Sequence, residues 1–388
     1  MKRKDFIKSV GAIGTAAVFS PFAANAGTYG SIRDKKIRVA VIGCGSVSGV
    51  YLPHLTKSPY VELVSVCDIK PERAKARAEQ FSVPNQYPHI DRMLEGADFD
   101  LMINLTDMQE HGRLNKIALL KGKHIWSEKP LANSYREGLE LLQLAKKQGV
   151  RIWGAPAVVN SPQFAFMAGQ INEKKLGTVA AAHAHYGHLG PTWSAFFYEN
   201  LGGSLPDLGV YNLSTLTGLL GPVKSVTAML NILTPERTVD DKGKIKVEAE
   251  DNASILMEHY SGAISHVMCG FNYFDPYGHQ GTGQDKPTVS LVGTRGAMHL
   301  IGYDWMPFAV EMATVDHEEP QRFSTDPGTY VWQEGASVIC ESLVTGNEPL
   351  INAEHSLHVL EIIEAARKSQ KEGTRVQLES VFPYPVIK

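Results

Sequence analysis

The feature that most constrains the fold is a β-branched run that ends on a glycine-rich turn. Residues 37–42 read Ile-Arg-Val-Ala-Val-Ile and are followed directly by Gly43-Cys44-Gly45-Ser46-Val47-Ser48. Helical spacing begins near Val50. A strand that leads through glycines into a helix is the first unit of an alternating strand–helix fold, and its glycine-rich turn can accommodate a nucleotide.

The alternation continues along the first part of the chain. Further strands are predicted at 61–66, 101–105 and 124–126, with helices at 71–81 and 109–121 between them. Such alternation predicts a parallel sheet with both faces covered. From about residue 179 the segments become longer and strictly alternating, as at 254–260 and 263–271, which predicts an open, mostly antiparallel sheet. A late helix is expected near 353–370 and a strand at 375–378.

The N-terminal segment resembles an export signal. Residues 1–26 begin with Lys2, Arg3 and Lys4, continue through an Ala- and Gly-rich stretch and end on Ala-Asn-Ala. Arg3-Lys4-Asp5-Phe6 also resembles the twin-arginine motif, with a lysine at the second arginine position. From these features we expect export to the periplasm. We expect no stable membrane anchor, because Gly14 and Pro21 interrupt the apolar stretch. An ordinary N-terminal helix is the alternative.

Bulk composition limits the partners. With 388 residues the chain is long enough for two domains. With a net charge of −3 and 20% charged residues, it is not expected to bind nucleic acid. The four cysteines stand apart and form no CxxC pair, which argues against a zinc knuckle and a disulfide framework.

The glycine turn has the context of a dinucleotide-binding loop. Gly43 permits the tight turn, Gly45 lets a pyrophosphate approach, and the helix N-terminus offers N–H donors. Cys44, Ser46 and Val47 complete the loop. Asp68 ends the second strand, where a carboxylate accepts from the adenosine ribose hydroxyls, although it could instead cap the helix that begins at Pro71. With Ile69 rather than an arginine beside Asp68, NAD is favoured over NADP.

Four segments together resemble the Gfo/Idh/MocA oxidoreductase family. They are Gly43-Cys44-Gly45, Thr106 with His111, Glu128-Lys129-Pro130, and Gly202-Gly203 with Asp207-Leu208-Gly209-Val210-Tyr211, in this order. The resemblance spans nearly all of the chain after the signal. It implies an α/β fold, with a Rossmann-type NAD-binding domain at 37–155 after a linker at 27–36. A C-terminal α+β domain at 156–388, with a large open sheet, would bind substrate and form a homodimer or homotetramer.

The resemblance also implies the catalytic group. Lys129 is the candidate acid/base, because an amine beside an oxidised nicotinamide suits proton transfer with a sugar hydroxyl. Asp207 and Tyr211 lie four residues apart, on one face of a helix, and would share the pocket. Tyrosine replaces the family's usual histidine at 211, as in relatives resembling glucose-fructose oxidoreductase. A capping aspartate and a core tyrosine remain the alternative.

Three further residues are expected near the cofactor. Thr106 and His111 retain part of the family's Thr-Pro-Asn-x-x-His segment, and Glu128 corresponds to a family residue on the nicotinamide side. Thr106 with Gln109 also has the pattern of a capping box, so a structural role is open as well.

Sugar-binding candidates lie between these motifs. Asn160, His185 and Trp193 are expected to contact substrate, because sugars stack on rings and need side-chain donors and acceptors. Alternation places His183 and His185 on one strand face, but no acidic or cysteine ligand accompanies them, so no metal is expected.

These features predict an exported oxidoreductase that transfers a hydride between a sugar, polyol or glycoside and a tightly bound NAD. Export favours tight binding, because no soluble nicotinamide pool is expected outside the cytoplasm. A redox-neutral glycosidase or epimerase of the same family is the first alternative, and a non-catalytic sugar- or nucleotide-binding protein is the second.

Overall fold

The computed structural model describes residues 35–275, 285–323, 326, 328 and 330–387. The expected export signal at 1–26 and nearly all of the linker at 27–36 lie outside the described residues. Residues Lys36–Lys388 group into one compact unit, whose described residues form two large sheets and one two-stranded sheet.

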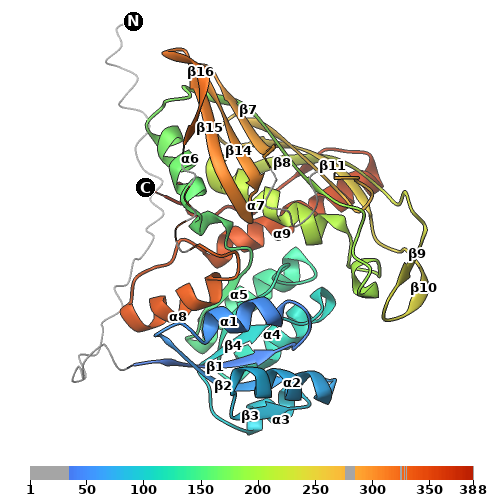
Figure 1. Cartoon of the computed structure of the whole chain (residues 1–388). Coiled ribbons are helices and arrows are strands. Elements are labelled where there is room, and N and C mark those ends of the chain that lie inside the picture. Colours follow the sequence, from blue (N-terminus) through green and yellow to red (C-terminus); the bar gives the residue numbers. More distant parts are fainter. Residues whose placement is uncertain (1–34, 276–284, 324–325, 327, 329, 388) are drawn as a thin grey trace, which may run out of the picture. The chain divides into compact units, whose positions relative to one another are not determined.

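The first sheet has six parallel strands in the order β3-β2-β1-β4-β5-β6 (Figure 1). Its strands are β1 (Ile37–Ile42), β2 (Val61–Cys67), β3 (Asn85–Tyr87), β4 (Leu101–Asn104), β5 (His124–Ser127) and β6 (Ile152–Gly154). The helical segments between them are α1 (Ser48–Leu55), α2 (Pro71–Phe81), α3 (Ile90–Glu95), η2 (Met108–Glu110), α4 (His111–Leu120) and α5 (Tyr135–Gln148). Every residue of β1 and β4 except Arg38 is buried, as expected for strands covered on both faces.

Local signals account for the helix ends. Helix α2 begins at Pro71, whose fixed φ suits the first turn, and ends before Ser82, which is left-handed with φ 54°. Helix α5 begins after Ser134, whose hydroxyl accepts a hydrogen bond from the Glu137 N–H, and ends before the left-handed Gly149.

The strand order places the candidate residues at one edge of this sheet. Strands β2 and β3 are added on one side of β1, and strands β4 to β6 on the other. At such a reversal of strand order a crevice opens at the carboxyl ends of the strands. The glycine loop follows β1, Asp68 follows β2, Thr106 lies just after β4, and Glu128 follows β5 directly.

The second sheet has nine strands in the order β16-β15-β14-β13-β7-β12-β11-β8-β17. They are β7 (Val179–Gly187), β8 (Val223–Asn231), β11 (Asn252–His259), β12 (Ile264–Gly270), β13 (Pro287–Gly293), β14 (Gly296–Tyr303), β15 (Met306–Thr314), β16 (His317–Phe323) and β17 (Val376–Gln377). The pair β7–β12 is parallel and the other pairs described in this sheet are antiparallel. A separate hairpin joins β9 (Glu236–Val239) to β10 (Gly243–Lys246).

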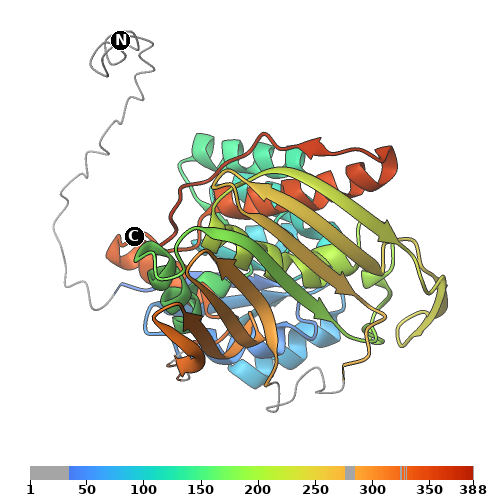
Figure 2. The ribbon, with the colours of Figure 1, turned by 90° about the horizontal axis from the view of Figure 1, so that it is seen from above.

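Helical segments cover one face of the second sheet, namely α6 (Pro162–Asn172), η5 (Leu205–Gly209), α7 (Val210–Leu220) and α9 (Ala353–Glu372). This part of the chain also contains η3 (Val158–Asn160), η4 (Ala195–Phe197) and α8 (Gly335–Thr345). Figure 2, which looks down on the sheet, shows the strands in front of α7 and α9. The face turned away from these helices carries exposed apolar side chains from β8, β11, β12 and β13, namely Met229, Leu256, Ile264 and Val292.

One cluster of buried side chains connects the two sheets. It includes Val39 and Trp126 of the first sheet together with Ile255 and Val267 of the second. Helix α8, far along the chain, packs on the first domain. Its Gly335 lies so close to Trp126 that a Cβ there would be 2.1 Å from the indole. Sequence patterns gave no sign of this contact.

The predicted fold class is therefore confirmed: a parallel Rossmann-type domain precedes an α+β domain with a large, mostly antiparallel sheet. Two predicted elements differ in detail. The helix expected at 109–121 is divided into η2 and α4, and the strand expected at 375–378 is reduced to β17. Among the described residues, no helix is both long enough and apolar enough to cross a membrane.

Candidate active site

The glycine loop between β1 and α1 leaves its backbone open to a ligand. Gly43 has φ 93°, and a Cβ there would lie 2.5 Å from the backbone carbonyl of Leu105, so the position requires glycine. At Gly45 the nearest atom to an added Cβ is 3.7 Å away. Within the described part of the chain, the N–H groups of Gly45, Ser46 and Val47 have no hydrogen-bond acceptor. Unpaired donors at the start of α1 fit the pyrophosphate of NAD.

Asp68 fixes this loop against the end of β2. Its Oδ2 accepts from the Cys44 N–H at 2.8 Å and its Oδ1 from the Lys70 N–H at 2.8 Å. No side-chain capping bond is found at the start of α2, so the helix-cap alternative for Asp68 is not what the geometry shows. A carboxylate has about four acceptor positions, which leaves capacity for ribose hydroxyls.

Two arginines of α2 reach the same loop. The Arg77 Nε donates to Ser48 Oγ at 3.0 Å, and its second terminal nitrogen donates to the Gly45 carbonyl at 3.3 Å. The guanidinium of Arg73 is the group 3.7 Å from the Cβ position of Gly45. These two arginines were not predicted from the sequence, because they are not adjacent to Asp68. Their i, i+4 spacing, which places both on one face of α2, was the signal that could have indicated them.

His111 connects the loop after β4 to the turn after β5. Its Nδ1 lies 2.7 Å from the Pro130 carbonyl oxygen and its Nε2 lies 3.0 Å from the Thr106 carbonyl oxygen. Burial lowers the pKa of His111, although both carbonyl contacts act in the opposite direction. Both ring nitrogens are engaged by backbone, so His111 holds the site together. Thr106 is itself fixed, since its Oγ1 donates to Asn104 Oδ1 at 2.7 Å.

Glu128 is held from inside the first domain. Its Oε1 accepts from the Tyr51 hydroxyl at 2.7 Å, and Tyr51 in turn accepts from the Trp126 indole N–H at 3.2 Å. Its Oε2 accepts from the backbone N–H of Lys129 at 3.0 Å. Buried Glu128 therefore orients the lysine that follows it.

Lys129 meets the second domain through Asp207. Its Nζ lies 2.6 Å from Asp207 Oδ1 and 2.8 Å from the Asp207 carbonyl oxygen. The Tyr211 ring is also close, with its centroid 5.1 Å from Nζ. The side chains of Lys129 and Asp207 are only 12% and 11% exposed. The structure thus brings together the three residues predicted to be catalytic, from opposite domains.

A π-helical turn presents Asp207. In η5 the Val210 N–H bonds to the Leu205 carbonyl, five residues back, and regular helix α7 begins at Val210. Such turns are frequent at functional sites because they change the usual backbone bonding. Here the Asp207 carbonyl and carboxylate both face one amine. The aspartate is not a simple helix cap, since no side-chain capping bond is found for η5 or α7.

Tyr211 is a neutral phenol in this setting. Burial raises its pKa well above the ordinary value, and the negative charges of Glu128, Asp207 and Asp304 act in the same direction. A phenol that keeps its proton donates a hydrogen bond. The family resemblance implies that Tyr211 helps Lys129 in proton transfer, which stays a prediction; the raised pKa favours Tyr211 as a hydrogen-bond donor in that step.

Aromatic rings surround Tyr211. Tyr186 lies edge-on to it at 6.1 Å between ring centroids, and Trp305 lies 6.4 Å away. Neither Tyr186 nor Trp305 was singled out from the sequence, because they come from β7 and from the turn after β14 and meet only in the folded chain. Apolar ring faces of this kind can stack on a sugar.

The three predicted substrate residues have different settings. Asn160 is half-buried beside Glu334; burial raises the pKa of the Glu334 carboxyl, and the side-chain amide of Asn160 acts in the opposite direction. Trp193 is 50% exposed and packs edge-on to Phe197 at 5.2 Å. His185 lies on the other face of β7 from Tyr186 and stacks on His183 at 5.8 Å. The structure does not bring His185 to Lys129, because alternate residues of a strand face opposite sides.

The histidines on the far face of the second sheet form a pair. The Nδ1 atoms of His183 and His266 lie 2.9 Å apart, and His266 Nε2 lies 2.8 Å from Ser254 Oγ. Within the described residues, no group of three or more His, Cys, Asp or Glu side chains could hold a metal ion.

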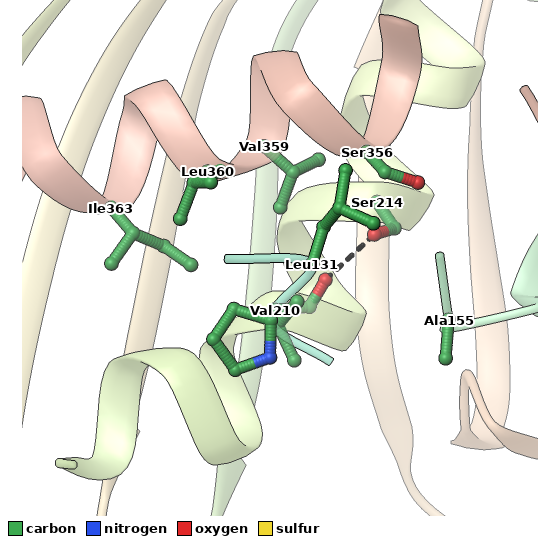
Figure 3. Close-up of a pocket in the computed structure, with 9 residues that line it drawn as sticks. Leu131, Ala155, Val210, Ser214, Ser356, Val359, Leu360 and Ile363 are labelled. Atoms are coloured by element: carbon green, nitrogen blue, oxygen red, sulfur yellow. Dashed lines mark hydrogen bonds between the residues drawn. The ribbon is translucent and has the colours of Figure 1, made fainter. Parts of the chain in front are cut away.

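Figure 3 shows a pocket behind the lysine turn. Leu131 lies near Val210 and Ser214 of α7, while Ser356, Val359, Leu360 and Ile363 come from α9. Pro130 and Ala155 complete the lining. Ser214 Oγ donates to the Val210 carbonyl at 2.8 Å. With a volume of about 10 Å³ this pocket is too small for a sugar, so its mostly apolar walls support the turn and α7.

Two family models match the chain. Residues 37–155 match the oxidoreductase family with an NAD-binding Rossmann fold, and residues 164–299 match the GFO/IDH/MocA C-terminal domain.

Individual relatives cover most of the chain at low identity. The trans-1,2-dihydrobenzene-1,2-diol dehydrogenase of Sus scrofa is 22% identical, over 86% of this chain and 96% of its own length. The D-apiose dehydrogenase of Rhizobium rhizogenes is 22% identical, over 89% of this chain and 99% of its own. The crystal structure of an aldose–aldose oxidoreductase from Caulobacter crescentus, complexed with glycerol, has a TM-score of 0.74 at 21% identity, covering 89% of this chain and 100% of that one.

Proposed function

The chain belongs to the Gfo/Idh/MocA oxidoreductase family, with an NAD-binding Rossmann domain, and on that premise we propose that it is an exported sugar oxidoreductase. It would transfer a hydride between a sugar, polyol or glycoside and a tightly bound NAD. The names of relatives support this substrate class, since they include a D-apiose dehydrogenase and an aldose–aldose oxidoreductase.

One observation carries the proposal: the contact of Lys129 Nζ with Asp207 Oδ1 at 2.6 Å and with the Asp207 carbonyl at 2.8 Å. Asp207 offers two acceptors to Lys129 Nζ. When Lys129 is an ammonium, as in the ion pair with Asp207, its third N–H is free to donate to a substrate oxygen. When Lys129 is a neutral amine, its two N–H donors can stay with Asp207 and its lone pair is free for the proton of a substrate hydroxyl.

The roles of the side chains follow from this arrangement. A bound nicotinamide supplies the hydride acceptor or donor. Lys129 takes the hydroxyl proton and becomes an ammonium, whose charge the Asp207 carboxylate stabilises. Tyr211, as a neutral phenol, donates to the substrate oxygen, and in the reverse direction Lys129 returns the proton.

The free N–H groups of Gly45, Ser46 and Val47 would hold the pyrophosphate, with Asp68 on the adenosine ribose. In the exported protein, this cofactor must be regenerated without a soluble pool. Oxidation of one sugar coupled to reduction of another satisfies that requirement. Redox-neutral glycoside cleavage or epimerisation, in which the cofactor is reduced and reoxidised in place, does so too.

The experiment begins with the cofactor. The purified mature protein is denatured, the released nucleotide is identified by mass spectrometry, and nicotinamide absorbance is followed with single sugars, sugar pairs and aryl glycosides. We expect bound NAD and sugar-dependent absorbance changes that Lys129→Met abolishes and the surface variant Lys147→Met retains. Absence of released nucleotide would contradict the retained cofactor, and glycoside cleavage without net reduction would establish the redox-neutral alternative.

Localisation needs its own measurement. Cell fractionation should place the protein in the periplasm, and Arg3→Gln with Lys4→Gln should retain it in the cytoplasm if the twin-arginine-like motif directs export. Equal periplasmic amounts of both forms would contradict that route.

A further inference from the structure

A partly buried ion pair, with side-chain exposures of 30% for Arg367 and 9% for Glu250, lies beside the turn that precedes Asp207. Gly203 has φ 114°, and a Cβ there would lie 2.4 Å from Glu250 Oε1, so the carboxylate occupies the space of a side chain. The Ser204 N–H donates to the Glu250 carbonyl at 2.8 Å.

The partner cation comes from α9. A terminal nitrogen of Arg367 donates to the Gly202 carbonyl at 2.6 Å and lies 3.2 Å from Glu250 Oε1. Arg367 therefore joins the carboxylate to the backbone of the same turn. Glu250, just before β11, and Arg367 contact the two consecutive glycines from different elements.

The turn is continuous with the π-helical segment. The Asp207 N–H bonds to the Gly203 carbonyl at 3.3 Å, so the position of Gly203 sets the start of η5. Further along, a Cβ on Gly209 would lie 2.9 Å from the Cys269 sulfur, which leaves the segment little room to shift. Because the Asp207 N–H bonds directly to Gly203, we expect a displacement of Gly203 to change the position of the Asp207 backbone.

We propose that the Glu250–Arg367 ion pair is a positioning device that sets Asp207 against Lys129 through the Gly202–Gly203 turn. The proposal rests on the function assigned above to Lys129 and Asp207. Neither residue of the ion pair contacts Lys129, so both act through the backbone. A misplacement of about 1 Å at such a contact can cost on the order of 100-fold in rate.

If the ion pair were purely structural, its removal would lower the stability of the fold without changing the reactivity of Lys129. The discriminating measurement is the reactivity of the Lys129 amine, followed by acetic anhydride labelling and mass spectrometry from pH 6 to pH 10. Because the carboxylate and the carbonyl of Asp207 both accept a hydrogen bond from Lys129 Nζ, moving them away frees the amine and increases its labelling.

The variants are Glu250→Gln, Arg367→Met and Arg367→Lys. Glu250→Gln and Arg367→Met should increase Lys129 labelling at pH 8 by about fivefold or more, and Arg367→Lys should restore much of the wild-type value because it keeps the charge. NAD⁺ affinity, measured by calorimetry, should stay within about twofold, since the glycine loop is in the other domain.

The matched control is the more exposed ion pair between Glu258 and Arg375, also at β11. Glu258→Gln should leave Lys129 labelling unchanged. If Glu250→Gln does not fold, the double variant Glu250→Gln/Arg367→Met, which leaves no uncompensated charge, takes its place. Wild-type labelling in folded Glu250→Gln or Arg367→Met, or an equal increase in the control, would overturn the proposal. Sugar turnover retained by Lys129→Met would instead contradict the proposed function.

Discussion

The Lys129–Asp207 ion pair allows stability and catalysis to be separated in one set of variants. Both side chains are nearly buried and their charged atoms are 2.6 Å apart. Lys129→Met leaves the carboxylate without its cation, Asp207→Asn leaves the ammonium with only amide and carbonyl acceptors, and the double variant leaves neither charge.

The magnitude follows from the geometry. At 2.6 Å and an effective dielectric constant of about 20, the attraction between unit charges is about 6 kcal/mol before desolvation is subtracted. Removing one partner of a buried ion pair typically costs about 3–5 kcal/mol, because the other charge stays buried. We therefore expect Lys129→Met to lower the free energy of unfolding by about 3 kcal/mol. Asp207→Asn should cost less, since the Asp207 carbonyl still accepts from Nζ at 2.8 Å.

The double variant should recover about 2 kcal/mol relative to the sum of the single losses, because no unpaired charge remains. Urea unfolding followed by tryptophan fluorescence measures the stabilities, and sugar-dependent nicotinamide absorbance measures turnover. Turnover should fall by about 100-fold or more in both variants that lack Lys129, even where stability recovers. Additive losses of stability would refute the buried-pair reasoning, and parallel recovery of turnover would refute the acid/base role.

Three further outcomes are expected. Tyr211→Phe, which removes a hydrogen-bond donor but keeps the ring, should lower turnover about 10-fold or more and leave NAD⁺ affinity unchanged by calorimetry; a loss equal to that of Lys129→Met would contradict the donor role. Gly43→Ala should weaken NAD⁺ binding and cost about 1–3 kcal/mol in urea unfolding, because its Cβ meets the Leu105 backbone; wild-type stability and affinity would contradict this. Burial lowers the pKa of His358 to about 3, and its Nε2 accepts from the Val223 N–H at 2.8 Å, so its contribution to stability is complete above pH 6.5 and falls as the pH drops from 6.5 towards 3. About 2–3 kcal/mol should be lost by pH 4.5; an unchanged pH dependence in His358→Asn would exclude this histidine as the cause.

Much of the fold can be predicted from local patterns. The run at 37–42 and the glycines after it gave the first strand and loop, because burial on both faces and a positive φ leave few alternatives in residue type. Pro71 likewise predicted the start of α2. The predicted positions of Lys129, Asp207 and Tyr211 came from motif order, which records the family resemblance but not the contacts.

The sequence alone determined which residues have the chemistry for the reaction: an amine, a carboxylate and a phenol on a nucleotide-binding scaffold. Only the tertiary structure decided which of them meet. Asp207 reaches Lys129 through a π-helical turn, Arg73 reaches the glycine loop from the next helix, and strand alternation turns His185 away. These outcomes depend on contacts between residues 28 to 78 positions apart or on the face that a strand presents. Local periodicity contains no information about such contacts, because packing between elements fixes them.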